Sequence, residues 1–284
     1  MKFIDTFTAF PKERSLEQLR AYYEKYPEIF NIYFTYHCKN TDERLNQAIE
    51  KYPNDWESIQ KVHDSMTDLI EEVVRSYKVK YQLEFPISVN LIVGAYGSNA
   101  YTHREIIPGI TFAMERLSPE ADPLRAIIAH EFGHAAHNII SDGHQMDWKT
   151  VQWMHPYVTL LQEGAATHFS RQIIPNLKES IYFSHDNNGD DWLQFALENK
   201  TVIIHRFAND LNSGKPHIEI FKEWFSINGG ATFGHTRLAY FIADTFFQES
   251  IKQIGELETL LWWKNEDFFS VVDEWLNRFA SAKN

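Results

Sequence analysis

The sequence is poor in cysteine and in positive charge, and it has no long apolar run. Cys38 is the single cysteine among 284 residues, so no intrachain disulfide can form and a metal site would need His, Asp or Glu ligands. The formal net charge of -12, with no compensating run of Lys or Arg, argues against a nucleic-acid partner. No apolar stretch approaches the roughly 18 residues of a membrane span, and residues 1–5 do not begin a signal peptide, so we expect a cytoplasmic protein without a membrane partner.

The chain nevertheless contains enough apolar surface for a large folded core. Hydrophobic residues make up 44% of it and aromatic residues 15%, which argues against disorder. A chain of this length can form one large domain or two lobes. It has no internal repeat and no low-complexity linker, so we expect its parts to pack as one unit.

The segment His130-Glu131-Phe132-Gly133-His134 carries the clearest chemical signal. Histidines four residues apart lie on one face of a helix, so both imidazoles can reach one ion. Zinc in catalytic sites takes such nitrogen ligands and keeps one position for water. Glu131 follows the first histidine and can take the proton of that water. We therefore predict a catalytic zinc helix.

The residues around this segment favour a buried helix. Prolines at 119 and 123 suit its first turn, and Ser141-Asp142-Gly143 supplies its end. Apolar residues surround it on nearly every side, and burying two histidines and a glutamate is costly unless something binds them. The alternative is a pair of core histidines satisfied by hydrogen bonds.

Glu163 is the predicted third ligand. It lies in the apolar, small-residue stretch 161–166 of a helix expected over Tyr157–Ile173, where a buried carboxylate needs a cation. The alternative is a surface glutamate on an amphipathic helix. Weaker ligand candidates lie between the two helices: His144, Asp147 and His155.

Other histidines fit the metal less well. Ile140 stands ten residues after His130, where a metzincin would have its third histidine, so that arrangement is excluded. His137 lies one turn beyond His134 and is expected to hydrogen-bond in the helix wall. His168 should point away from the face of Glu163, because five residues rotate a helix by about 500°.

Secondary structure before the zinc helix is predicted from periodicity. We expect a helix over 15–26, a strand over 28–37, and two helices over 41–51 and 55–77 separated by Pro53-Asn54. Strands are then expected over 86–93 and 109–116. A polar segment between them, Ala95 to His103, is expected at a sheet edge, where an extended peptide can pair. After residue 190 the pattern is helical, in four stretches: 192–212, 217–225, 236–254 and 267–280.

His130-Glu131-x-x-His134 followed by Glu163-Gly164-x-Ala166 resembles the gluzincin metallopeptidases, most of all the bacterial predicted zinc-dependent proteases whose glutamate motif reads E-G-x-A. The similarity extends from Ile87 to Trp275. It implies an α+β, zincin-like fold, with a small mixed sheet whose edge strand lies above the zinc helix, and a mainly helical C-terminal lobe.

We expect three parts in the chain, and the resemblance implies a further catalytic residue. Residues 1–80, which the resemblance does not cover, would form an N-terminal α/β extension packed on the core. Residues 81–175 would form the catalytic core, and 176–284 a helical lobe that closes the cleft. The segment 234–240 is similar to the family's helix start with glycine and tyrosine. Tyr240 would then donate a hydrogen bond to the oxyanion, with His235 as the second candidate.

The chain departs from the family pattern in two places, and a third segment resembles a motif of one family branch. The 28 residues between His134 and Glu163 imply an extra loop or short helix. Thr167 stands where some relatives have an Asp that orients a ligand histidine. The segment Phe112–Arg116 weakly resembles the G-A-M-E-N strand of gluzincin aminopeptidases, but it lies too close to the zinc helix, and we interpret it as coincidence.

The sequence therefore favours a zinc-dependent peptidase. Its metal would be Zn2+ held by His130, His134 and Glu163, its general base Glu131, and its substrate a peptide or protein. A non-catalytic, zinc-stabilised peptide-binding protein is the alternative, and hydrolysis of another amide or an ester is a third possibility. Endopeptidase and aminopeptidase action both remain open.

Overall fold

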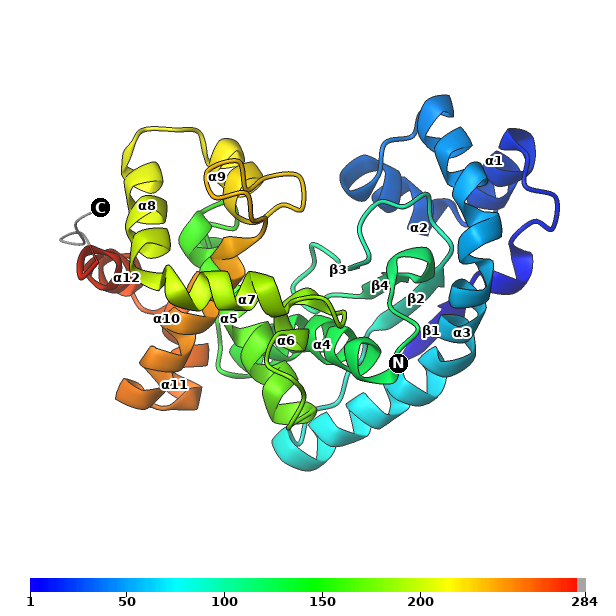
Figure 1. Ribbon diagram of the computed structural model, residues 1–284. Coiled ribbons are helices and arrows are strands. Elements are labelled where there is room, and N and C mark those ends of the chain that lie inside the picture. The colour runs from blue at the N-terminus through cyan, green and yellow to red at the C-terminus, as the bar shows by residue number, and fades with distance from the viewer. Residues whose placement is uncertain (280–284) are drawn as a thin grey trace. The chain divides into compact units, whose positions relative to one another are not determined.

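A computed structural model describes residues 1–279 of the chain, which fold into a mixed α/β structure (Figure 1). They divide into two compact units. The first contains residues 1–135 and the second begins at Ala136, so the division falls within one continuous helix, α4 (Ala121–Gly143). Among the described residues no helix combines the length and the apolarity that crossing a bilayer requires.

The first unit contains a four-stranded mixed sheet in the order β1-β2-β4-β3. Its strands are β1 (Lys2–Asp5), β2 (Ser88–Ile92), β3 (Ala100–Thr102) and β4 (Ile110–Ala113). Strands β1, β2 and β4 are parallel, whereas β3 runs antiparallel to β4 with Thr102 opposite Ile110. The strands predicted over 86–93 and 109–116 are thus confirmed as β2 and β4. Strand β3, one of the two edge strands, lies within the segment 95–103 that was expected at a sheet edge.

The N-terminal helices agree with the prediction in one place and differ in another. The helix predicted over 15–26 is confirmed as α1 (Leu16–Glu24), and Ser15 is its N-cap. The predicted strand over 28–37 is wrong, because this segment forms helix α2 (Pro27–Ile32) and the π-helix η2 (Tyr33–His37). The buried side chains there, at 29, 30 and 33, recur at helical spacing, and the aromatic and β-branched composition concealed that period.

The prediction of two helices separated at Pro53 is also wrong. Helix α3 (Asp42–Tyr81) continues through Pro53 without interruption. A proline inside a helix costs roughly 3 kcal/mol, because it removes a hydrogen bond and crowds the preceding turn. Here Tyr52 beside the proline is fully buried, and Ala48 and Ile59 are buried on either side. Burial of this helix face therefore offsets the local cost.

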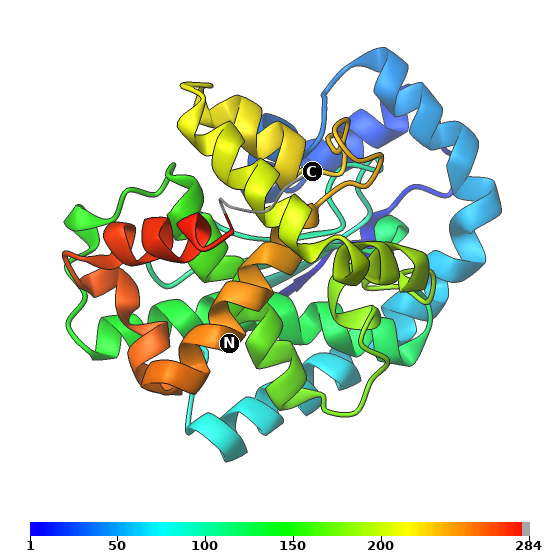
Figure 2. The same cartoon turned by 60° about the vertical axis from the view of Figure 1, so that its left-hand side comes forward.

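The second unit is helical in its described part, and Figure 2 shows its helices from yellow-green to red. In chain order they are α5 (Pro156–Ile173), α6 (Ile181–Ser184), α7 (Asp190–Glu198), α8 (Lys200–Asn212), α9 (His217–Trp224), α10 (Leu238–Ile254), α11 (Glu256–Leu260) and α12 (Phe268–Asn277). The helical pattern predicted over 192–212 is divided at Asn199 into α7 and α8. The predicted end of the last helix, Ala280, lies outside the described residues.

Short 3-10 turns lie between several of these strands and helices. A 3-10 turn, η1 (Phe7–Ala9), follows β1, and another, η3 (Met114–Arg116), ends the segment predicted as the second strand. Between α4 and α5 lies η4 (Trp148–Thr150), so the long interval between the two motif helices contains the expected short helix. A last turn, η5 (Trp262–Lys264), precedes α12.

Candidate metal centre

Helix α4 places the two motif histidines on one face. The ring centres of His130 and His134 lie 4.9 Å apart, with their planes nearly perpendicular. His130 is 3% exposed and His134 is half-buried. The helix is apolar around them, with Ile127, Phe132 and Ala135 buried. The imidazoles and the Glu131 carboxylate are therefore the polar groups of an otherwise apolar helix segment.

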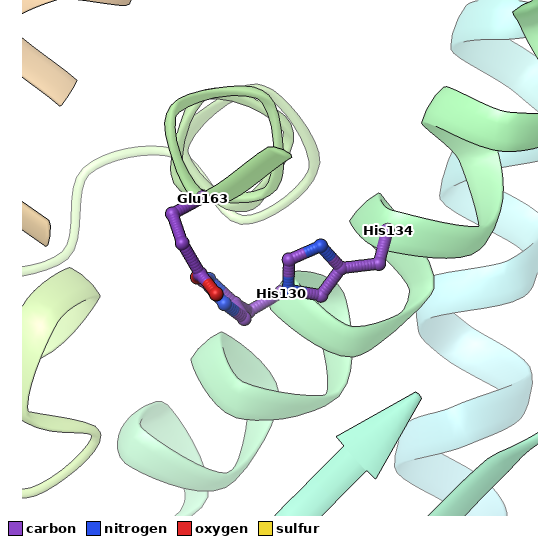
Figure 3. A group of neighbouring side chains, drawn as sticks. All are labelled: His130, His134 and Glu163. Atoms are coloured by element: carbon purple, nitrogen blue, oxygen red, sulfur yellow. The ribbon is translucent and has the colours of Figure 1, made fainter. Parts of the chain in front are cut away.

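Glu163 on α5 completes a group of three possible metal ligands. One nitrogen from each of His130 and His134 and one carboxylate oxygen of Glu163 all lie within 4.8 Å of one another. Figure 3 shows the imidazoles and the carboxylate turned toward one another. Within residues 1–279, no other group of three or more His, Cys, Asp or Glu residues meets this criterion. Two imidazoles and one carboxylate are the ligand set of a known class of catalytic zinc sites, so the residues fit the ion.

The glycine beside Glu163 has a structural reason. A Cβ atom on Gly164 would lie 2.7 Å from the backbone oxygen of Ala243 and 2.7 Å from Cβ of Phe247, both on α10. Helices α5 and α10 therefore pack backbone to backbone at this point, and both views show them side by side (Figures 1 and 2). The residue after the carboxylate must be glycine if the two helices are to stay this close.

Glu131 lies beside the ligand group and is held by a side chain from the sheet. It is 7% exposed, and Thr102 on β3 donates a hydrogen bond of 2.8 Å from Oγ1 to Glu131 Oε2. Sequence reasoning missed Thr102, although it lies in the segment 95–103 that was predicted at the sheet edge. No local pattern could reveal a contact between residues 29 positions apart.

Tyr240 and His235 lie at and before the start of α10. Tyr240 is half-buried, and the guanidinium of Arg237 lies 4.4 Å from its ring centre. Arg237 is the N-cap residue of α10, has a left-handed backbone with φ of 61°, and donates a hydrogen bond of 2.8 Å to the backbone oxygen of Phe183. His235 stacks on the ring of Phe195 at 4.1 Å. The sequence did not predict the contact between Arg237 and Tyr240.

The remaining histidine candidates are engaged elsewhere. His137 donates from Nε2 to the backbone oxygen of Leu260 at 2.7 Å, which confirms its predicted place in the wall. His168 hydrogen-bonds through Nε2 to Glu256 at 2.7 Å, so it faces another partner, as predicted. The weaker ligand candidates have local partners instead: His144 with the backbone of Ile140, Asp147 as the N-cap of η4, and His155 as the N-cap of α5.

The interpretation of the Phe112–Arg116 segment as a coincidental resemblance agrees with the surroundings of its carboxylate. Glu115 is buried and accepts hydrogen bonds from Gly94 N (2.8 Å) and Tyr96 N (3.0 Å). Burial raises the pKa of the Glu115 carboxyl to about 7, although these hydrogen bonds act in the opposite direction. The carboxylate therefore supports a loop of its own unit.

That loop, residues 94–97, has all four of its backbone N–H groups accepted by two side chains in alternation. Glu115 accepts the first and third, and the Tyr33 hydroxyl accepts the second and fourth at 2.8 and 2.9 Å. A Cβ atom on Gly94 would lie 2.5 Å from this hydroxyl, so only glycine fits there. Residues 98 and 99 connect this loop to the edge strand β3.

Comparisons with protein families, with curated proteins and with solved structures find no match for this chain. The candidate centre is therefore interpreted from its own residues and geometry.

Proposed function

We propose that the protein is a zinc-dependent peptidase whose ion is held by His130, His134 and Glu163. The observation that carries the proposal is the convergence of these three ligand atoms within 4.8 Å, with Glu131 next to the first ligand. A structural zinc site needs four closed ligands and has no use for a neighbouring carboxylate, whereas a catalytic site needs both the open position and the base.

Zinc bound there would polarise the scissile carbonyl and acidify a water molecule. Glu131 would take the proton from that water and pass it to the leaving amine, which requires a carboxylate that is ionised and held in place. Tyr240 would donate a hydrogen bond to the developing oxyanion, with His235 as the second candidate. Such a contact contributes on the order of 3 kcal/mol in other hydrolases.

The finer fold assignment is part of the same proposal. A mixed sheet whose edge strand contacts the helix of the H-E-x-x-H segment supports a zincin-like core, and the E-G-x-A segment supports the gluzincin type. Strand β3 has one ladder partner, β4, so its other edge can pair with an extended peptide. This edge supports the proposal of a peptide or protein substrate.

The first test measures metal and turnover on the full chain. We expect the purified protein to bind zinc in a one-to-one ratio, to cleave fluorescein-labelled casein, to lose cleavage on treatment with a chelator and to regain it when Zn2+ is added back. Matched peptides with free and N-acetylated termini then separate aminopeptidase from endopeptidase action. A chain that binds no zinc, or binds it and cleaves neither casein nor peptides, overturns the proposal.

A further inference from the structure

The edge strand β3 contributes a side chain that hydrogen-bonds to Glu131, the proposed general base. Thr102 Oγ1 lies 2.8 Å from Glu131 Oε2 and 3.4 Å from the Glu131 backbone oxygen. A threonine hydroxyl has one proton, so the shorter contact is the principal hydrogen bond. An ionised carboxylate can only accept, so Thr102 must be the donor. The hydrogen bond to a charged acceptor is of the stronger kind.

The residues on either side of Thr102 fix the position of its hydroxyl group. The neighbouring His103 donates its backbone N–H to Gly109 O at 2.8 Å, and its Nε2 lies 2.8 Å from Thr111 Oγ1 on β4. Residues 98 and 99 join the strand to the loop at residues 94–97, whose four amides are all accepted by side chains. A β-branched residue also has restricted χ1 rotation. The Thr102 hydroxyl therefore has a defined position from which it can orient another group.

We propose that Thr102 is a positioning residue for Glu131, an inference that rests on the proposed function of this site. Its hydrogen bond to Oε2 would fix the orientation of the carboxylate that accepts the proton of water. It would also hold this carboxylate away from a bound ion. Glu131 follows the proposed ligand His130 in the chain but is not part of the ligand group. Without the hydrogen bond from Thr102, the Glu131 carboxylate would turn to the bound cation and occupy the coordination position that water needs.

The test compares two substitutions at one position. Thr102→Val keeps the shape and removes the hydroxyl, whereas Thr102→Ser keeps the hydroxyl. With casein and quenched peptides as probes, we expect Thr102→Val to lower kcat by roughly 10–100-fold, the usual range for partners that orient a metal site, while KM changes less than about twofold. Thr102→Ser should retain most of kcat. Thr35→Val, which removes an exposed hydroxyl bonded to Asn31, is the matched control.

A second readout does not depend on turnover. The full chain is loaded with Co2+, whose visible absorption reports its coordination. We expect the spectrum to change in Thr102→Val and to stay unchanged in Thr102→Ser. In the double variant Thr102→Val/Glu131→Gln, the change should disappear, because the carboxylate that would turn to the ion is gone.

A failure of the proposed function can be distinguished from a failure of the proposed role of Thr102. If the wild-type chain cleaves nothing, the proposed function fails, and the Co2+ spectra alone decide the role of Thr102. Identical spectra in the wild type and Thr102→Val overturn the inference. In an active enzyme, an unchanged kcat in Thr102→Val, or an equal loss in Thr102→Ser, overturns it as well.

Discussion

Glu131 is the residue that distinguishes a catalytic zinc site from a structural one, because zinc binding alone does not need it. Replacing it with Gln keeps the size and removes the base. We expect Glu131→Gln to lower kcat by about 10²–10⁴-fold, the range that general base catalysis supplies. Zinc content, measured by mass spectrometry of the metal, should stay at the wild-type level. If Glu131→Gln still cleaves substrate at the wild-type rate, Glu131 is not the general base and the proposed mechanism is wrong. That result would favour the non-catalytic peptide-binding protein.

Glu163 is predicted to contribute to zinc affinity directly. Glu163→Ala removes one of the three proposed protein ligands, so the loss of zinc affinity should exceed the roughly 10–100-fold loss that follows from removing an outer partner of a metal site. Competition with a chromophoric chelator measures the affinity. Glu198→Ala, on the exposed face of α7, is the matched control. Wild-type zinc affinity in Glu163→Ala would remove this carboxylate from the site.

At the residue scale, the sequence predicts local chemistry better than long-range contacts. The two histidines could be found because their spacing matches one helical turn, and Glu163 because a carboxylate stands out in an apolar stretch. Thr102 and Arg237 could not be found in this way. Their importance depends on which segment the fold brings beside them, and neither residue type is unusual for its strand or loop.

At the scale of elements, the close packing of α5 on α10 leads to a stability prediction. Gly164→Ala would place a methyl group against the backbone of Ala243, which cannot move as a flexible side chain would. We expect the free energy of unfolding in urea to fall by about 1–3 kcal/mol, the usual cost of overpacking. Zinc affinity should also fall, because the neighbouring Glu163 moves with α5.

A second glycine provides the control for this change. A Cβ atom on Gly143, the last residue of α4, would meet nothing within 4 Å. Gly143→Ala should therefore change the free energy of unfolding by less than about 0.5 kcal/mol. Equal effects at the two glycines would contradict the proposed close contact between α5 and α10.

The sequence predicted helices and strands correctly where the hydrophobic residues had a clear period. It predicted them wrongly where the amino-acid composition favoured another type of element. Helices α4 and α5 and the central strands β2 and β4 follow directly from their sequence patterns. The segment of α2 and η2 has strand-like composition but helical burial, and α3 contains a proline that local rules treat as a break. In both cases the packing of the surrounding chain outweighs a preference of about 1–3 kcal/mol.

For the whole molecule, Glu115 links folding to pH. The carboxyl has an ordinary pKa of 4.5, and burial raises it to about 7 in the folded chain. Between these values the unfolded chain has lost the proton and the folded chain retains it. The free energy of unfolding therefore falls as pH rises, by about 1.4 kcal/mol per pH unit and by on the order of 3 kcal/mol across the interval.

Two half-buried histidines change the stability in the opposite direction over part of this pH range. Desolvation lowers the pKa of His37 and of His155 to about 4, so each remains neutral in the folded chain while the unfolded chain takes up a proton below about 6.5. Their contribution makes stability rise with pH between about 4 and 6.5. The pH profile of the wild type alone therefore cannot isolate the effect of Glu115.

The variant Glu115→Gln isolates the contribution of Glu115 to the pH dependence of stability. The wild type and the variant share both histidines and differ in one titrating group. The variant also loses an acceptor for the amides of Gly94 or Tyr96, but that cost is the same at every pH. Urea unfolding in the presence of a chelator, from pH 4.5 to pH 7.5, gives the difference in stability between the wild type and the variant without a contribution from metal. We expect the wild type to lose about 3 kcal/mol relative to the variant as pH rises to 7, and no more above it. A difference that stays flat would mean that the two backbone amides keep Glu115 ionised in the folded chain despite its burial.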